Sequence, residues 1–256
     1  MNTSAKIGFL FIFFVNYSLT ILGQGEISDR KHFNNNELSY AIHLNSNGVE
    51  FNTHYGKRLD GTRRRLWSAS FSWIRHPKEY KISNPYFDSK RKFVFGKVNS
   101  LYTLKLGYGK HKIIYNKTDK GVAVSYSYQI GPVFGFLKPV YYEILYPTST
   151  PYQYLVITEK FDYTIHGPSD IYSRASFFTG LNETTVTPGG FIRFGFDFEF
   201  SDEEEKLTAL ECGGQVEVFP QTMTIMANAE NSFFFVSVFV GYRFGRITKT
   251  MLNAQY

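Results

Sequence analysis

Cysteine is almost absent from this sequence, because its 256 residues contain only Cys212. A single thiol excludes an intrachain disulfide and a metal site built from several cysteines. The six histidines are scattered, and no pair of histidines or carboxylates stands at the spacing of metal ligands. We therefore expect no metal ion and no cofactor.

Long apolar runs are also missing beyond the N-terminus. No later stretch reaches about 18 consecutive apolar residues, the length from which a helix can cross a bilayer. The formal net charge of +6 could suit nucleic acid or anionic lipid, but no nucleic-acid motif accompanies it. We therefore expect no nucleic-acid partner and no helical membrane span.

Aromatic residues are abundant instead. They make up 18% of the chain, with 26 Phe and 19 Tyr, although the mean hydropathy is only −0.24. This combination favours a protein whose apolar residues are distributed singly along strands rather than pooled in helices.

The N-terminus resembles an export signal. Lys6 precedes a short apolar run over 7–15, and small or polar residues follow as far as Gly23. A run of about nine residues is too short for a spanning helix, so we expect a signal peptide over 1–23, cleaved near Gly23. A polar leader is expected over 24–37.

Alternation with a period of two dominates the rest of the chain. In 189–201, Phe194, Phe196 and Phe198 alternate with charged residues and glycine, and Asn47-Gly48 gives a strong hairpin signal. A soluble β-barrel or sandwich would bury these apolar faces. The opposite faces, however, are small and polar, and the apolar faces end in aromatic residues, as in a barrel with its large side chains toward lipid. The side chains expected to face lipid are Trp67, Trp73, Phe194, Phe196 and Phe198.

These segments predict an all-β fold, a closed antiparallel transmembrane β-barrel over 38–246. Eight strands result if 120–146 is one long bent strand, and ten are the alternative. Long extracellular loops are expected over 76–98 and 147–188, and a further outer loop over 220–231. A short helix is expected around 153–161, and a tail over 247–256.

The opposite faces of the strands define a predicted polar interior. Its expected members are Glu50, His54, Lys105, Arg193, Asp197, Glu199, Glu211, Glu217 and Arg243. They could form a conduit or gate, but about eight strands leave room only for side chains, which favours a plug of salt bridges. A catalytic pairing of His54 with Ser68, Ser70 or Ser72 is the weaker alternative.

Two basic regions flank the predicted strands. Lys57, Arg58 and 63–65 surround one turn and would make its rim positive. Lys78, Lys81 and 90–92 lie in an expected outer loop, where they could meet lipid phosphates. For both regions, ordinary solvated charge is the simpler alternative.

The chain resembles the small outer-membrane β-barrel proteins of Gram-negative bacteria. The resemblance is most specific at Val240, Tyr242 and Phe244, which look like the aromatic-ending signal that the barrel-assembly machinery reads in a final strand. Here residues 245–256 continue beyond that strand. The resemblance implies a location in the cell outer membrane, contact with its lipids, and insertion by that machinery.

Three functions remain open on the sequence alone. The first is a non-enzymatic structural or accessory component of an outer-membrane assembly, with 147–188 as a surface for an envelope protein partner. The second is a narrow solute channel. The third is a lipid-modifying enzyme, which we consider the weakest and do not expect.

Overall fold

The structure is a computed structural model that describes residues 35–87, 91–116, 121–150, 153–201 and 205–249. The expected signal peptide and the leader before 35 lie outside these residues. The elements are β1 (Asn35–Asn45), β2 (Gly48–Arg58), β3 (Arg63–Ile74), β4 (Lys81–Ile82), β5 (Phe93–Val94), β6 (Asn99–Tyr115), β7 (Ala123–Pro139), β8 (Tyr141–Pro147), β9 (Tyr154–Lys160), β10 (Ile171–Arg174), a 3-10 turn at Leu181–Glu183, β11 (Thr185–Glu199), β12 (Lys206–Val218) and β13 (Phe234–Lys249).

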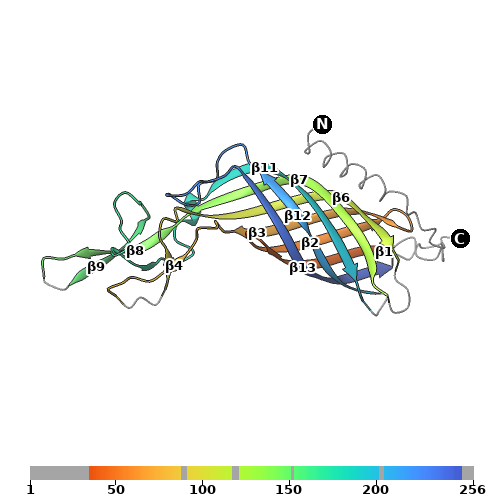
Figure 1. Ribbon diagram of the computed structural model, residues 1–256, viewed down its shortest axis with the longest axis horizontal. Coiled ribbons are helices and arrows are strands. Elements are labelled where there is room, and N and C mark those ends of the chain that lie inside the picture. The colour runs from red at the N-terminus through yellow and green to blue at the C-terminus, as the bar shows by residue number, and fades with distance from the viewer. Residues whose placement is uncertain (1–34, 88–90, 117–120, 151–152, 202–204, 250–256) are drawn as a thin grey trace, which may run out of the picture. The chain divides into compact units, whose positions relative to one another are not determined.

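Eight strands close into an antiparallel barrel in the order β1-β13-β12-β11-β7-β6-β3-β2, which confirms the predicted strand number (Figure 1). The segment 120–146, which was expected to be one long bent strand, is divided instead: β7 lies in the barrel, and β8 pairs with β9 and β10 in a separate sheet. Each of the eight barrel strands pairs with a neighbour on both sides, so the barrel has no free edge. Closure matters because an unpaired backbone group in hydrocarbon costs several kcal/mol.

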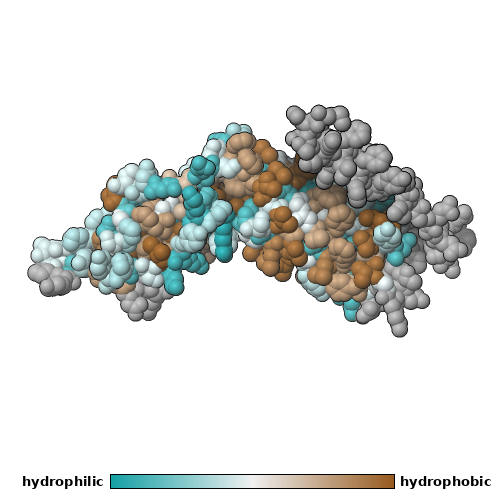
Figure 2. Space-filling view, in the orientation of Figure 1, coloured by the Kyte–Doolittle hydropathy of each residue, from teal (hydrophilic) through white to brown (hydrophobic). Residues whose placement is uncertain are grey.

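The two faces of the barrel differ as the alternation predicts. In β11, Ile192, Phe194, Phe196 and Phe198 are exposed, while Arg193 and Asp197 between them are buried. Figure 2 shows apolar side chains gathered over the barrel strands. The described part of the chain contains no helix with the length and apolarity that a membrane-spanning helix needs.

The barrel is slightly longer than the range expected from the sequence. Strand β1 begins at Asn35 rather than 38, and β13 continues to Lys249 rather than ending at 246. The reason is that these two ends pair with each other, through Asn35 and Lys249. Residues assigned to the leader and the tail therefore contribute to the seam that closes the barrel.

The two ends of the barrel carry different connections. At one end, which we call the turn end, strands are joined by 59–62, 116–122 and 200–205. At the other, the loop end, they are joined by 75–98, 140–184 and 219–233, and by a tight turn at 46–47. In outer-membrane barrels the short turns are periplasmic and the long loops extracellular.

A second sheet, in the order β10-β8-β9, lies in the segment between β7 and β11. It has its own small core, in which Tyr142, Phe161 and Ile171 are buried. The helix expected around 153–161 is wrong, because residues Tyr154–Lys160 form β9 and pair with β8. The run Val156-Ile157-Thr158 favours a strand through its β-branched side chains.

An apolar plug closes the mouth of the barrel at its loop end. Phe219, Met223 and Ile225, from the connection between β12 and β13, pack against barrel residues such as Leu101 and Val133. Asn231 fixes this connection: its Oδ1 accepts hydrogen bonds from the Ile225 and Met226 amides at 2.7 and 3.1 Å. The sequence predicted only an outer loop here, whereas the structure folds it inward.

Candidate functional site

The half of the barrel interior nearer the loop end holds a cluster around Lys105. The Lys105 side chain is 0% exposed, and its Nζ donates to Glu50 Oε2 at 2.7 Å and to Glu217 Oε1 at 2.8 Å. Arg193 donates to the other Glu50 oxygen at 2.6 Å. Gln215 completes the cluster by donating to Glu50 at 3.1 Å. Four strands thus supply one connected ionic network.

A second cluster occupies the half nearer the turn end and centres on Arg243. Its guanidinium lies 3.0 Å from Glu211 Oε1 and 3.3 Å from Asp197 Oδ1, and it also pairs with Glu37. Glu37 in turn accepts from Arg64. These contacts join strands β1, β3, β11, β12 and β13, so they connect opposite parts of the barrel wall.

His43 links the two clusters. One of its ring nitrogens lies 2.5 Å from Glu211 Oε2, and the other lies 3.0 Å from the Arg193 guanidinium. The network therefore runs without interruption from Glu37 to Lys105. The side chains of this network are buried against one another inside the barrel, as expected for about eight strands.

The interior residues predicted from the sequence mostly lie together. Eight of the nine are buried inside the barrel, and the exception, Glu199, is half-buried at the turn end, where it accepts from Ser201. The residues in the two clusters or beside them are Glu50, His54, Lys105, Arg193, Asp197, Glu211, Glu217 and Arg243.

Several interior residues were missed by the sequence reasoning, among them Gln215 and His111 as well as three members of the network. Glu37 was assigned to the leader and Arg64 to a basic rim, while His43 lay in the predicted barrel but was not singled out. The parity of the alternation could have found Arg64 and His43, since each stands at an even spacing from an inward-facing neighbour on its own strand. Lys57 and Arg65 do remain on the outer surface.

The predicted outward-facing residues are on the outer surface, with one exception. Trp67, Phe194, Phe196 and Phe198 are exposed, as are Val240, Tyr242 and Phe244 of the last strand. Trp73 is half-buried, because the Arg75 guanidinium lies over its ring at 4.1 Å.

No serine hydroxyl is paired with His54. Neither ring nitrogen of His54 has a hydrogen-bond partner within the described residues, and Ser68 donates to Gln129 instead. Ser72 shares its hydrogen bond with Thr103. Among the described residues, Ser68 and Ser72 therefore have no hydrogen-bonded base of the kind that activates a nucleophile. Across the described residues, no group of three or more histidine, cysteine or carboxylate side chains is arranged to hold a metal ion.

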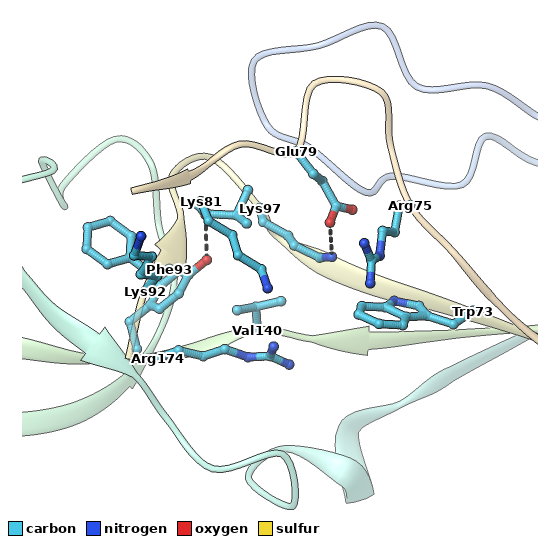
Figure 3. Close-up of a pocket in the computed structure, with 11 residues that line it drawn as sticks. Trp73, Arg75, Glu79, Lys81, Lys92, Phe93, Lys97, Val140 and Arg174 are labelled. Carbon is cyan, nitrogen blue, oxygen red and sulfur yellow. Dashed lines mark hydrogen bonds and ion pairs between the residues drawn. The ribbon is translucent and has the colours of Figure 1, made fainter. Parts of the chain in front are cut away.

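A pocket at the loop end is lined by five cations, one carboxylate and five apolar or aromatic residues (Figure 3). We call it the loop-end pocket; its lining residues are Trp73, Arg75, Glu79, Lys81, Lys92, Phe93, Val94, Lys97, Val140, Tyr142 and Arg174. They come from the end of β3, the 75–98 connection, β8 and β10, so the second sheet and the barrel build it together. Tyr142 donates to the Val94 carbonyl at 2.6 Å and joins two of these segments.

One carboxylate balances part of this charge. Glu79 pairs with Lys97 at 2.7 Å, and both side chains are largely buried. Burial lowers the pKa of Lys97; Glu79 opposes this change, while Arg174 and Arg75 add to it. Arg75, Lys81, Lys92 and Arg174 form no ion pair with any residue that the structure describes.

The closed strand order, the apolar outer surface and the charged interior together determine the fold class. The chain is a transmembrane-type β-barrel. This confirms, for the fold, the resemblance to small outer-membrane barrels that the sequence suggested. The transmembrane-type barrel is assigned from the chain's own geometry. No protein-family model and no curated protein matches the sequence.

Solved structures with a similar fold include barrels from three groups of bacteria. Ail, the attachment invasion locus protein of Yersinia pestis, matches at 9% identity and a TM-score of 0.39, over 84% of this chain and 99% of Ail; one of its structures contains the heparin analogue sucrose octasulfate. The N-terminal β-barrel domain of Pseudomonas aeruginosa OprF matches at 9% identity and a TM-score of 0.34, over 85% of this chain and 100% of that domain. Neisserial surface protein A matches at 8% identity and a TM-score of 0.34, over 82% of this chain and 93% of that protein.

Proposed function

We propose that this protein is a non-conducting, non-enzymatic barrel of the Gram-negative outer membrane that serves as a structural or accessory component of an envelope assembly. The observation that carries this proposal is the closed interior, in which ionic clusters fill the barrel and an apolar plug covers one mouth. With its interior occupied by its own side chains, the barrel offers its outer segments for function. Lipid acyl chains surround its exposed apolar band.

A narrow solute channel is the alternative that this geometry disfavours. A conducting path would have to pass Met223 in the plug and then Lys105, and both side chains are 0% exposed. The test is conductance of the purified full chain in planar bilayers. We expect no steps above the bare-membrane level; regular steps that persist at several protein concentrations would contradict the proposal.

The surface for a partner is proposed in 147–188, and the most suitable element there is β9. It is an edge strand of its sheet, with one side unpaired among the described residues. Tyr154, Leu155 and Val156 are all exposed. An unpaired apolar edge is a template for a strand from another chain, because its free backbone groups supply the hydrogen bonds.

The partner hypothesis is tested by blocking this edge. Leu155→Lys places a charge on β9, which should reduce strand addition, and Thr150→Lys is the matched control in the exposed connection before it. We would measure the amount of envelope protein that co-purifies, after mild detergent extraction, with a tagged chain. We expect a loss of about tenfold for Leu155→Lys, equivalent to about 1.4 kcal/mol. Equal recovery from both variants, or a chain that is monomeric in the extract, would contradict this role.

A further inference from the structure

The loop-end pocket carries a positive charge that the described part of the chain does not neutralise. Five cations and one carboxylate line it, so its formal charge is +4. Figure 3 shows Arg75, Lys81, Lys97 and Arg174 directed toward a common space. Like charges brought together repel one another, and the arrangement is relieved when an anion binds between them.

The pocket begins where the outer surface of the barrel changes from apolar to polar. Trp73, one of its lining residues, stacks against Tyr102 with ring centroids 6.4 Å apart, and Tyr102 stacks against Phe71 at 5.9 Å. Phe71 is exposed on the apolar face of β3. In membrane barrels such an aromatic belt lies at the level of the lipid headgroups. The cations therefore stand beside and beyond the headgroup level at the loop end.

We propose that the loop-end pocket binds a phosphate group of a phosphorylated glycolipid headgroup in the outer leaflet. Arg174 and Arg75 supply planar guanidinium groups that can donate two hydrogen bonds to one phosphate, and Lys81 and Lys92 supply point charges. A phosphate offers up to two negative charges and three acceptor oxygens, which suits several converging cations better than a single carboxylate does. The apolar wall of Phe93 and Val140 suits the uncharged part of such a headgroup.

The proposal is tested with the purified full chain in nanodiscs. The probe is lipid A carrying two phosphates, compared with the same lipid after the phosphates are removed, and binding is read as displacement of a fluorescent lipid A. We expect at least tenfold tighter binding of the phosphorylated lipid, weakened by added salt because the contacts are ionic. Arg174→Gln and Lys81→Gln should each weaken binding about fivefold, the effect of about 1 kcal/mol for each basic residue near a membrane.

Arg65→Gln is the matched control, because it removes the same charge from the exposed surface at the turn end. It should leave lipid binding unchanged. Lys81 is exposed in the two-residue strand β4, so its variant should fold even if Arg174→Gln does not. Equal affinity for the phosphate-free lipid, or an equal loss in Arg65→Gln, would overturn the proposal. Arg174-dependent binding of inorganic pyrophosphate without a preference for phosphorylated lipid would overturn the lipid source.

Discussion

At the scale of single residues, Lys105 is a buried cation whose removal should strongly lower the free energy of unfolding. It neutralises Glu50 and Glu217, and all three side chains are almost completely buried. Lys105→Met would leave Glu217 without its cation inside the barrel, so we expect the free energy of unfolding to fall by about 3 kcal/mol. Urea unfolding in lipid vesicles measures this change.

A second substitution identifies the cause of that loss. In the double variant Lys105→Met/Glu217→Gln, the unpaired carboxylate is replaced by a neutral amide, and a large part of the stability should return. Lys112→Met removes an exposed lysine from the same strand and should change the stability by less than about 0.5 kcal/mol. If the double variant were no more stable than Lys105→Met, lost packing rather than unpaired charge would be responsible.

Individual interior residues could be predicted where apolar neighbours fixed the parity of a strand. Arg193 stands between Ile192 and a phenylalanine, Asp197 between two phenylalanines and Lys105 between two leucines, so their direction followed from the sequence. Glu37 follows a polar segment and has no apolar residue directly before it to show the direction of its side chain. The pairing of particular charges, such as Arg243 with Glu37, depends on closure of the barrel between residues at opposite ends of the chain, which a local pattern does not contain.

At the scale of elements, the connection between β12 and β13 stabilises the barrel through its plug. Met223 is fully buried there, while Thr222 beside it is exposed. Met223→Ala should reduce the free energy of unfolding by about 2–4 kcal/mol because it leaves a cavity among packed apolar side chains. Thr222→Ala should have little effect. Equal unfolding midpoints for the two variants would show that the plug is not packed as described.

The last strand, β13, supplies an assembly prediction. Tyr242 and Phe244 are exposed on its outer face, and Phe198 holds a similar place on β11. If the end of β13 is read by the assembly machinery, Phe244→Ser should lower the yield of folded barrel in the envelope several-fold more than Phe198→Ser does. The folded fraction is measured on gels of unboiled samples. Equal losses would mean that only the apolar surface matters.

The barrel strands could be predicted because bilayer and lumen impose opposite demands on alternate residues. The second sheet has no such constraint: both faces of β9 are exposed, and its sequence shows no alternation. Its local pattern was therefore compatible with a helix, and only its pairing with β8 decides the structure. The plug was equally hidden, since nothing in its own sequence indicates that it folds into the barrel mouth.

At the scale of the whole molecule, the closed barrel should resist detergent. Every barrel strand is paired on both sides, so unfolding must break the ring as a unit. We expect unboiled protein to migrate differently from boiled protein on a denaturing gel, with the folded form kept in the membrane fraction. Identical migration before and after boiling, with recovery of soluble protein, would contradict a membrane barrel.

Orientation in the bilayer gives a separate prediction. A spin label at position 194, in Phe194→Cys, should contact lipid, whereas one in Lys112→Cys near the turn end should contact water. The native Cys212 would first be replaced by alanine. Accessibility to oxygen and to a water-soluble nickel complex distinguishes the two environments. Equal access of the nickel complex to both positions would oppose a lipid-facing outer surface.

The seam between β1 and β13 has a consequence for how the ring is completed. Arg243 on β13 lies opposite Ala41 on β1 and contacts both Ser39 and Glu37 diagonally across the junction of these two strands. A slip of one residue would turn that guanidinium out into hydrocarbon. The contacts of Arg243 therefore favour one pairing register between β1 and β13 and disfavour the registers shifted by one residue, so the barrel closes in a single alignment.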